Sequence, residues 1–98
     1  MEKLFVYGTL AAPAVQRAVI GRVIAGAPDT LNGYYKDEIR LGLRTYPIAR
    51  PRAGASIAGL VLEVTPEELA LCDRYETDAY RRVRVTLVSG VEAWVYSG

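Results

Sequence analysis

Residues 57–76 read IAGLVLEVTPEELALCDRYE and carry the clearest fold signals in the chain. Its first eight residues are almost all apolar and include several strand formers, which predicts a buried β-strand. Thr65, Pro66 and Glu68 follow with three signals for the start of a helix: a hydroxyl at the N-cap, proline at the first helical position and glutamate at the third. A buried strand therefore leads directly into a capped helix that runs to about Tyr75.

The segments before this unit predict a second strand and a second helix. Residues 3–7 are mostly apolar β formers, and Gly8 and Thr9 end the run in a tight loop. Apolar residues recur at helical spacing over residues 11–20, and Gly21 stops this short helix.

The middle of the chain carries weaker patterns. Residues 22–26 favour a short strand, whereas residues 31–39 fit either a strand or a loop. Within them, Gly33 indicates a bulge or a close approach of the backbone. Residues 41–55 contain glycine and proline breaks and show no period, so we expect an ordered loop there.

The C-terminal segment predicts a hairpin. Alternating residues 82–87 and the run 91–96 are joined by a two-residue turn at Ser89-Gly90. The whole pattern gives about six strands and two short helices without regular βαβ alternation. We therefore expect an α+β fold, a small mixed, mainly antiparallel β-barrel, in a single domain over residues 1–98.

Composition excludes several classes of function. Twelve basic and 11 acidic residues leave a net charge of +1, which gives no strong field for nucleic acid or an anionic membrane. Histidine is absent and Cys72 is the one cysteine, so Ser-His and Cys-His catalysis and the common zinc sites are excluded. The start of the chain has no signal-peptide pattern and no segment is long and apolar enough for a membrane span, so we expect a cytoplasmic protein.

Glu76 falls at a position where a charged carboxylate is energetically unfavourable. On a helical wheel, Glu76 lies inside the apolar arc, between Leu69 and Cys72. Burial and the negative end of the helix dipole both raise a carboxyl pKa toward neutrality, which suits proton transfer. Two structural interpretations stay open: the helix ends two residues earlier and Glu76 turns outward, or Glu76 pairs with Arg81 or Arg84.

A second candidate is the loop formed by Tyr7, Gly8, Thr9 and Leu10. A strand that ends in Gly-Thr before a helical segment can leave several backbone N–H groups pointing one way, and such a nest binds a carboxylate or an oxyanion. The alternative is an ordinary glycine turn. Seven tyrosines, Tyr80 among them, suit a pocket for a small polar ligand, or else fill space between strands.

At these residues the chain resembles the γ-glutamylcyclotransferase-like family, in particular its AIG2-like and γ-glutamylamine cyclotransferase branch. The likeness runs over about residues 3–96, essentially the whole chain. Thr77 departs from the pattern, since glycine often follows the catalytic glutamate in that family. The motifs that carry the resemblance are, in chain order, Leu4-Phe5-Val6-Tyr7-Gly8-Thr9-Leu10, Tyr46-Pro47, Gly59, Leu71-Cys72-Asp73-Arg74-Tyr75-Glu76, Tyr80-Arg81-Arg82-Val83-Arg84-Val85 and Trp94-Val95-Tyr96.

The resemblance implies a small barrel whose cavity holds a γ-glutamyl group. It implies that Glu76 acts as general base and then acid, and that the loop of residues 7–10 binds the substrate through backbone groups. Tyr7 and Tyr80 are expected to line the pocket and to form hydrogen bonds there. The expected partner is a small γ-glutamyl substrate, which is converted to 5-oxoproline and a free amine without metal or cofactor. The alternative function is a non-enzymatic module of the same fold that binds a small ligand or a protein partner.

Overall fold

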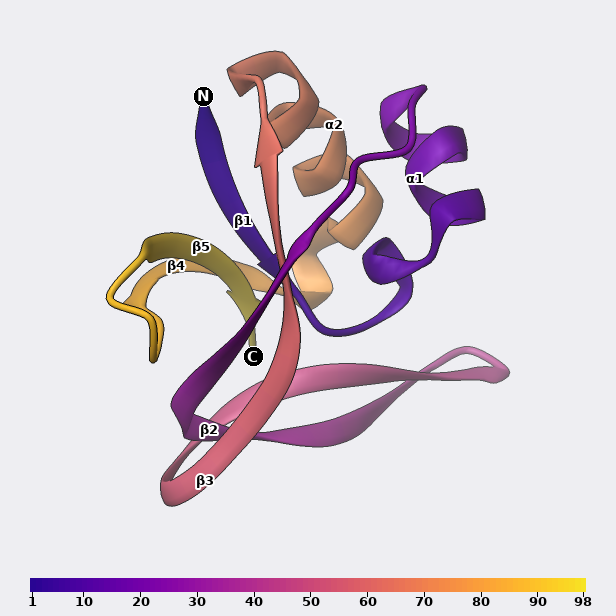
Figure 1. Cartoon of the computed structure of the whole chain (residues 1–98). Coiled ribbons are helices and arrows are strands. Elements are labelled where there is room, and N and C mark those ends of the chain that lie inside the picture. The colour runs from indigo at the N-terminus through magenta and orange to yellow at the C-terminus, as the bar shows by residue number, and fades with distance from the viewer.

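A computed structural model describes residues 1–98 of the chain (Figure 1). Five strands, two α-helices and two short 3-10 helices make up the fold. In chain order they are β1 (Glu2–Val6), η1 (Thr9–Ala11), α1 (Pro13–Ile20), β2 (Ala27–Leu41), β3 (Arg44–Val64), α2 (Pro66–Glu76), η2 (Thr77–Ala79), β4 (Arg81–Thr86) and β5 (Glu92–Ser97).

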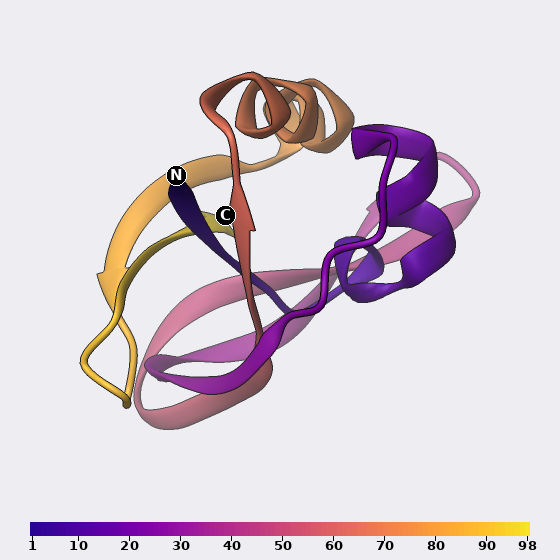
Figure 2. The same ribbon diagram turned by 45° about the horizontal axis from the view of Figure 1, so that its top comes forward.

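The five strands form one sheet in the order β2-β3-β1-β5-β4. Neighbours run antiparallel, except that β5 pairs in parallel with β1 at Leu4↔Trp94 and with β3 at Ala49↔Ser97. Because β3 contacts both β1 and β5, the sheet curls back on itself as half of a barrel (Figure 2). The expected α+β, mainly antiparallel architecture is confirmed, with five strands instead of six.

Alternation along the strands builds a separate apolar core on each face of the sheet. Leu4 and Val6 of β1 pack on one face, together with Leu69 and Cys72 of α2. Phe5, between them in sequence, belongs to the core on the other face. The two helices α1 and α2 lie side by side over the first face, as both views show. Neither helix is long and apolar enough to cross a membrane.

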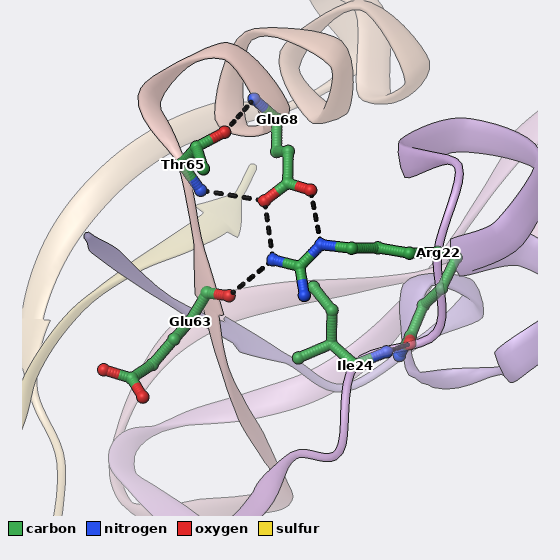
Figure 3. A network of polar contacts seen from close by, with 6 residues as sticks. Arg22, Ile24, Glu63, Thr65 and Glu68 are labelled. Atoms are coloured by element: carbon green, nitrogen blue, oxygen red, sulfur yellow. Dashed lines mark hydrogen bonds and ion pairs between the residues drawn. The ribbon is translucent and has the colours of Figure 1, made fainter.

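The start of α2 is fixed by a polar network (Figure 3). The Glu68 N–H donates to Thr65 Oγ1 at 3.1 Å and the Thr65 N–H donates to Glu68 Oε1 at 2.9 Å, which is the capping box that the sequence predicts. Arg22, after α1, donates to both carboxylate oxygens of Glu68, at 2.7 and 2.9 Å. The network orients α2, whose other end carries Glu76.

Residues 41–55 are strand and turn, which corrects the expectation of a loop. The hairpin of β2 and β3 is paired from Ala27 against Val61 out to a turn at Gly42. Its outer part, residues 34–51, pairs with β5 at Ala49 and is called the arm below (Figure 1).

The two prolines of the arm obscured this strand in the sequence. The Ala49 N–H donates to the Tyr7 hydroxyl at 2.9 Å, away from β2. Pro47 and Pro51 lie two residues to either side, and the two-residue period of a strand gives them the same orientation. Their missing N–H groups therefore cost the β2–β3 ladder no hydrogen bond.

Of three smaller expectations, the structure confirms one and corrects two. Gly33 has φ of +83° and lies at a shift of register in the hairpin, so the predicted bulge is confirmed. Residues 22–26 are not a strand, because β2 begins only at Ala27. The turn between β4 and β5 is longer than two residues: the Leu87 N–H donates to the Val91 carbonyl at 2.8 Å and closes a loop of three residues.

Candidate active site

A cavity of about 210 Å³ opens where β1 and α2 end. The loop after β1, the arm, the end of α2 and strand β5 all contribute to its wall. The residues that line it are Phe5, Val6, Tyr7, Gly8, Thr9, Leu10, Leu41, Tyr46, Pro47, Tyr75, Glu76, Thr77, Tyr80 and Tyr96. All six candidate residues from the sequence, Tyr7, Gly8, Thr9, Leu10, Glu76 and Tyr80, are therefore brought together at one place.

Glu76 is the last residue of α2 and lies half-buried in the cavity wall. Leu69 and Cys72, on the same side of the helix, are 5% and 0% exposed, as the helical wheel predicts. The helix does not end two residues earlier, and none of the ion pairs of the protein includes Glu76. Both alternative interpretations, an outward turn and a pair with Arg81 or Arg84, are therefore wrong.

Burial raises the pKa of Glu76 from its ordinary value of 4.5 to about 7. Loss of hydration is the cause, since neither a cation nor a hydrogen-bond donor of the protein compensates the carboxylate. Near neutral pH the group is divided between its acid and base forms, which is the state that proton transfer in both directions requires. Burial, followed by the charge of Glu76, also raises the pKa of Tyr80 to about 12, so its phenol stays protonated.

The loop after β1 holds hydrogen-bond donors that the fold does not use. The N–H groups of Ala11 and Ala12 donate to the carbonyls of Gly8 and Thr9, at 3.0 Å each. The N–H groups of Gly8, Thr9 and Leu10 donate to no acceptor within the protein. Three consecutive unused amides at the wall of a cavity form a site suited to a carboxylate or an oxyanion.

The hydroxyls of Tyr7 and Tyr80 are occupied by the protein backbone. Tyr7 donates to the Tyr96 carbonyl at 2.6 Å and accepts from the Ala49 N–H at 2.9 Å, which ties the end of β1 to β5 and to the arm. Tyr80 donates to the Pro47 carbonyl at 2.8 Å. Both phenol groups therefore fix the shape of the cavity. Their hydroxyl protons are used within the protein, and their rings are available for contact with a ligand.

Two further contacts hold the unused amides in place. A Cβ on Gly8 would come 2.8 Å from Pro47 Cγ, so glycine allows this loop to lie against the arm. On the other side, the Thr9 and Tyr75 hydroxyls are hydrogen-bonded at 2.8 Å, which joins the loop to the last turn of α2. The loop and the end of α2 that carries Glu76 are thereby joined in the wall of the cavity.

Thr77, directly after Glu76, has a conformation that glycine usually adopts. Its φ of +60° with ψ of −168° makes it the one residue other than glycine with positive φ. This region of backbone space costs about 1–3 kcal/mol for a residue with a Cβ. The strain coincides with the departure from the family pattern noted in the sequence, and it lies beside the candidate catalytic carboxylate.

Sequence reasoning missed part of this wall. Tyr75 and Thr77 flank Glu76 in sequence, so adjacency to the candidate acid could have indicated them. Leu41 and Tyr46 reach the cavity from the two strands of the arm. Tyr46 belongs to the Tyr46-Pro47 motif of the resemblance, whereas no local signal points to Leu41, because its placement depends on the hairpin pairing.

The chain matches a known protein family over nearly its whole length. The family model described as gamma-glutamyl cyclotransferase, AIG2-like, matches residues 4–97. AIG2-like protein D of Arabidopsis thaliana is 33% identical over 89 residues, which cover 90% of this chain and 57% of that protein. AIG2-like protein C of the same plant is 34% identical over 86 residues, covering 87% and 49%. The chain spans about half the length of these curated relatives.

Solved structures share the fold. Two Arabidopsis thaliana proteins with solution structures superpose with TM-scores of 0.86 and 0.83, at 28% and 29% identity. Each comparison covers 98% of this chain, and 67% and 61% of the respective partner. A crystal structure of an uncharacterized Pyrococcus horikoshii protein superposes with a TM-score of 0.69 at 22% identity, over 99% of this chain and 77% of that one, which is a likeness of fold alone.

Proposed function

The chain belongs to the AIG2-like gamma-glutamyl cyclotransferase family, and we propose that it cleaves a γ-glutamyl compound into 5-oxoproline and a free amine. The observation that carries this proposal is the placement of Glu76. A carboxyl group whose pKa is about 7 lies in the wall of a largely apolar cavity, beside three unused backbone donors. A module that only binds a ligand has no need of such a group.

In the proposed complex the substrate's α-carboxylate, or the oxyanion formed later, lies against the N–H groups of Gly8, Thr9 and Leu10. The rings of Tyr7 and Tyr80 bound the space for the glutamyl chain. The α-amino group then faces Glu76, the one ionisable carboxyl group in the wall.

Glu76 first acts as a base. The α-ammonium group has to lose a proton before its nitrogen can attack the γ-carbonyl carbon, and the Glu76 carboxylate accepts this proton. Attack closes a five-membered ring and moves negative charge onto the γ-carbonyl oxygen. Because the nucleophile and the carbonyl belong to one molecule, holding the chain in a bent conformation supplies a large effective molarity.

Glu76 then acts as an acid. It gives its proton to the leaving nitrogen as the bond between that nitrogen and the γ-carbon breaks, and the second proton of the attacking nitrogen follows the same route. Two protons leave the α-nitrogen and two reach the leaving nitrogen, so the amine departs as an ammonium ion and 5-oxoproline keeps one N–H. The proposed steps use no metal or cofactor.

The test measures 5-oxoproline after incubation of the purified protein with a panel of γ-glutamyl amines and γ-glutamyl dipeptides. Wild type is compared with Glu76→Gln, and with Glu92→Gln as a control that removes an exposed carboxylate outside the cavity. General acid–base catalysis contributes about 10²–10⁴-fold. We expect Glu76→Gln to lose at least about a hundredfold in kcat, and Glu92→Gln to keep wild-type activity.

Two results would overturn the proposal. One is the absence of 5-oxoproline from every substrate in the panel. The other is a Glu76→Gln variant as active as the wild type, which would leave the carboxyl group without a part in proton transfer.

A further inference from the structure

Gln16 is a buried polar residue on the side of α1 that faces the core. It is 2% exposed, and Ile20, one turn further along the same side of the helix, belongs to the apolar core beneath the two helices. Glutamine is mostly found at the surface, and burying its amide group is unfavourable unless the group is hydrogen-bonded. A glutamine at this position therefore depends on its hydrogen-bond partners.

The side-chain amide of Gln16 joins two other segments of the chain. Its Nε2 donates to the Leu10 carbonyl at 3.0 Å, and its Oε1 accepts from the Ile24 N–H at 2.8 Å. These partners fix the orientation of the amide, because the carbonyl can only accept and the N–H can only donate. The contact with Ile24 holds the segment between α1 and β2, whereas the contact with Leu10 reaches the loop that carries the three unused N–H groups.

The bond to Leu10 acts on these unused donors through two linked peptide groups. A trans peptide group is planar, and its C=O and N–H point in opposite directions. The Leu10 carbonyl therefore shares one plane with the Ala11 N–H, which donates to the Gly8 carbonyl at 3.0 Å. The Gly8 carbonyl shares the next plane with the Thr9 N–H, which is one of the unused donors. Gln16 thus fixes one end of a series whose other end is a donor at the cavity.

The Leu10 carbonyl has no donor other than Gln16. No backbone N–H of the protein donates to it, and Pro13, three residues further on, lacks the N–H that would close another 3-10 turn. Leu10 is only 3% exposed, so without Gln16 its carbonyl would be buried and unpartnered, and the peptide group would turn and carry the Ala11 N–H with it. Donors that stabilise an anion in catalysis are fixed in place before the charge develops.

From this arrangement, and on the basis of the function proposed above, we infer that Gln16 is a positioning residue of the active site. It does not line the cavity, but it holds the N–H groups of Gly8, Thr9 and Leu10 in the orientation that receives an anionic group of the substrate. A purely structural role, in which Gln16 ties α1 to the segment before β2, accounts for the bond to Ile24 and not for the bond to Leu10.

The first experiment compares the kinetics of wild type, Gln16→Met and Val19→Ala with the γ-glutamyl substrate that wild type turns over fastest. Methionine fills a similar space but forms neither hydrogen bond. Val19→Ala is the matched control, because it shortens a side chain on the same helix that packs against the same core and removes no hydrogen bond. Loss of one donor to a developing oxyanion costs about 10²–10³-fold, and Gln16 acts through the loop, so we expect Gln16→Met to lose at least about tenfold in kcat/KM. Val19→Ala should keep the wild-type value.

Two kinetic readouts separate positioning from general damage to the fold. A rise in KM at unchanged kcat would show that the loop holds the substrate's carboxylate, and a fall in kcat would show that it holds the oxyanion; either result supports the inference. The midpoint that Glu76 gives to the pH profile of kcat/KM should stay at its wild-type value, because Gln16→Met leaves Glu76 in place. A shifted midpoint, or a loss no larger than that of Val19→Ala, would overturn the inference.

Binding separates the inference from the proposed function. L-5-oxoproline carries both groups that the loop amides could hold, the carboxylate and the carbonyl oxygen that bears the negative charge during ring closure. In ¹H–¹⁵N NMR titrations it should shift the amide signals of residues 8–10 in wild type, and its Kd should be at least about tenfold higher for Gln16→Met and unchanged for Val19→Ala. The same spectra show whether each variant is folded. If Gln16→Met is not, Gln16→Asn replaces it with the same expectation, since its amide is one methylene too short to bond both partners.

The outcomes of the titration and of the activity assay can differ. If wild type releases no 5-oxoproline from any substrate but the difference in affinity for L-5-oxoproline holds, the proposed function is wrong and the positioning role of Gln16 stands. Equal affinities of wild type and the Gln16 variant, or no shift of the amide signals of residues 8–10 in wild type, would refute that role.

Discussion

Replacement of Glu76 by glutamine should stabilise the fold at alkaline pH, because the wild-type fold has to bury a charge there. Burial raises the pKa of Glu76 in the folded protein to about 7, from an ordinary value of 4.5. Below pH 4.5 both states hold the proton and no charge is buried. Between pH 4.5 and 7 the folded protein keeps a proton that the unfolded chain releases, so the free energy of unfolding falls as the pH rises. Above about pH 7 the loss is complete.

The size of the effect follows from the shift in pKa. One pKa unit corresponds to 1.36 kcal/mol, so a rise from 4.5 to about 7 gives an upper limit of roughly 3 kcal/mol. Glu76 is only half-buried, and solvent screening reduces the expected value to about 2 kcal/mol. For a domain of 98 residues this corresponds to a difference in Tm of roughly 10 °C.

The assay is urea or thermal unfolding of wild type and Glu76→Gln at pH 5 and pH 8.5. At pH 8.5 the free energy of unfolding of the variant should exceed that of the wild type by about 2 kcal/mol, and at pH 5 by well under half of that amount. Carboxyl groups whose pKa is lowered, such as those of Asp29 and Asp37, titrate below this range and are shared by both proteins, so their contributions cancel. Glu92→Gln, which removes an exposed carboxylate outside the cavity, is the matched control. A stability difference between wild type and Glu76→Gln that is the same at both pH values would show that the folded protein buries no charge at Glu76 at alkaline pH.

Three further predictions concern stability, each measured by urea unfolding. Thr65→Ala removes the N-cap oxygen that accepts from the Glu68 N–H and should cost about 1 kcal/mol, whereas Thr65→Ser should recover most of it; no loss with alanine would show that the cap is dispensable. Thr77→Gly relieves the positive φ and should be about 1 kcal/mol more stable than Thr77→Ala, which keeps the Cβ; the reverse order would argue against strain. Gly59→Ala forces a Cβ into the Val6 carbonyl and to 2.6 Å from the Phe5 ring, and should destabilise by about 1–3 kcal/mol; wild-type stability would show that β1 moves freely.

Features encoded in a few neighbouring residues were predictable from the sequence. Thr65, Pro66 and Glu68 predict the capped helix, because the Thr65 and Glu68 side chains accept from each other's backbone N–H and proline fits the first helical position. Gly33 indicates the bulge through its conformational freedom. The half-buried position of Glu76 follows from the helical period alone, once the start of the helix is known.

Features that depend on distant pairing were not predictable. The arm reads as a loop because its regularity comes from pairs such as Glu38 with Pro47, which no single segment displays. The parallel pairing of Leu4 with Trp94 curls the sheet. The local sequence at either end of the chain does not show that these two strands pair. For the same reason Leu41 could not be assigned to the cavity before the hairpin was known.

The central claim is that the fold holds Glu76 as a proton-transfer group near neutral pH. NMR titration of the ¹³C-labelled side-chain carboxyl of Glu76, assigned by comparison with Glu76→Gln, tests this claim most directly. We expect a titration midpoint near pH 7. A midpoint close to the ordinary value of 4.5 would contradict it, since the carboxyl group would then be an ionised surface group with no proton to return to a leaving amine.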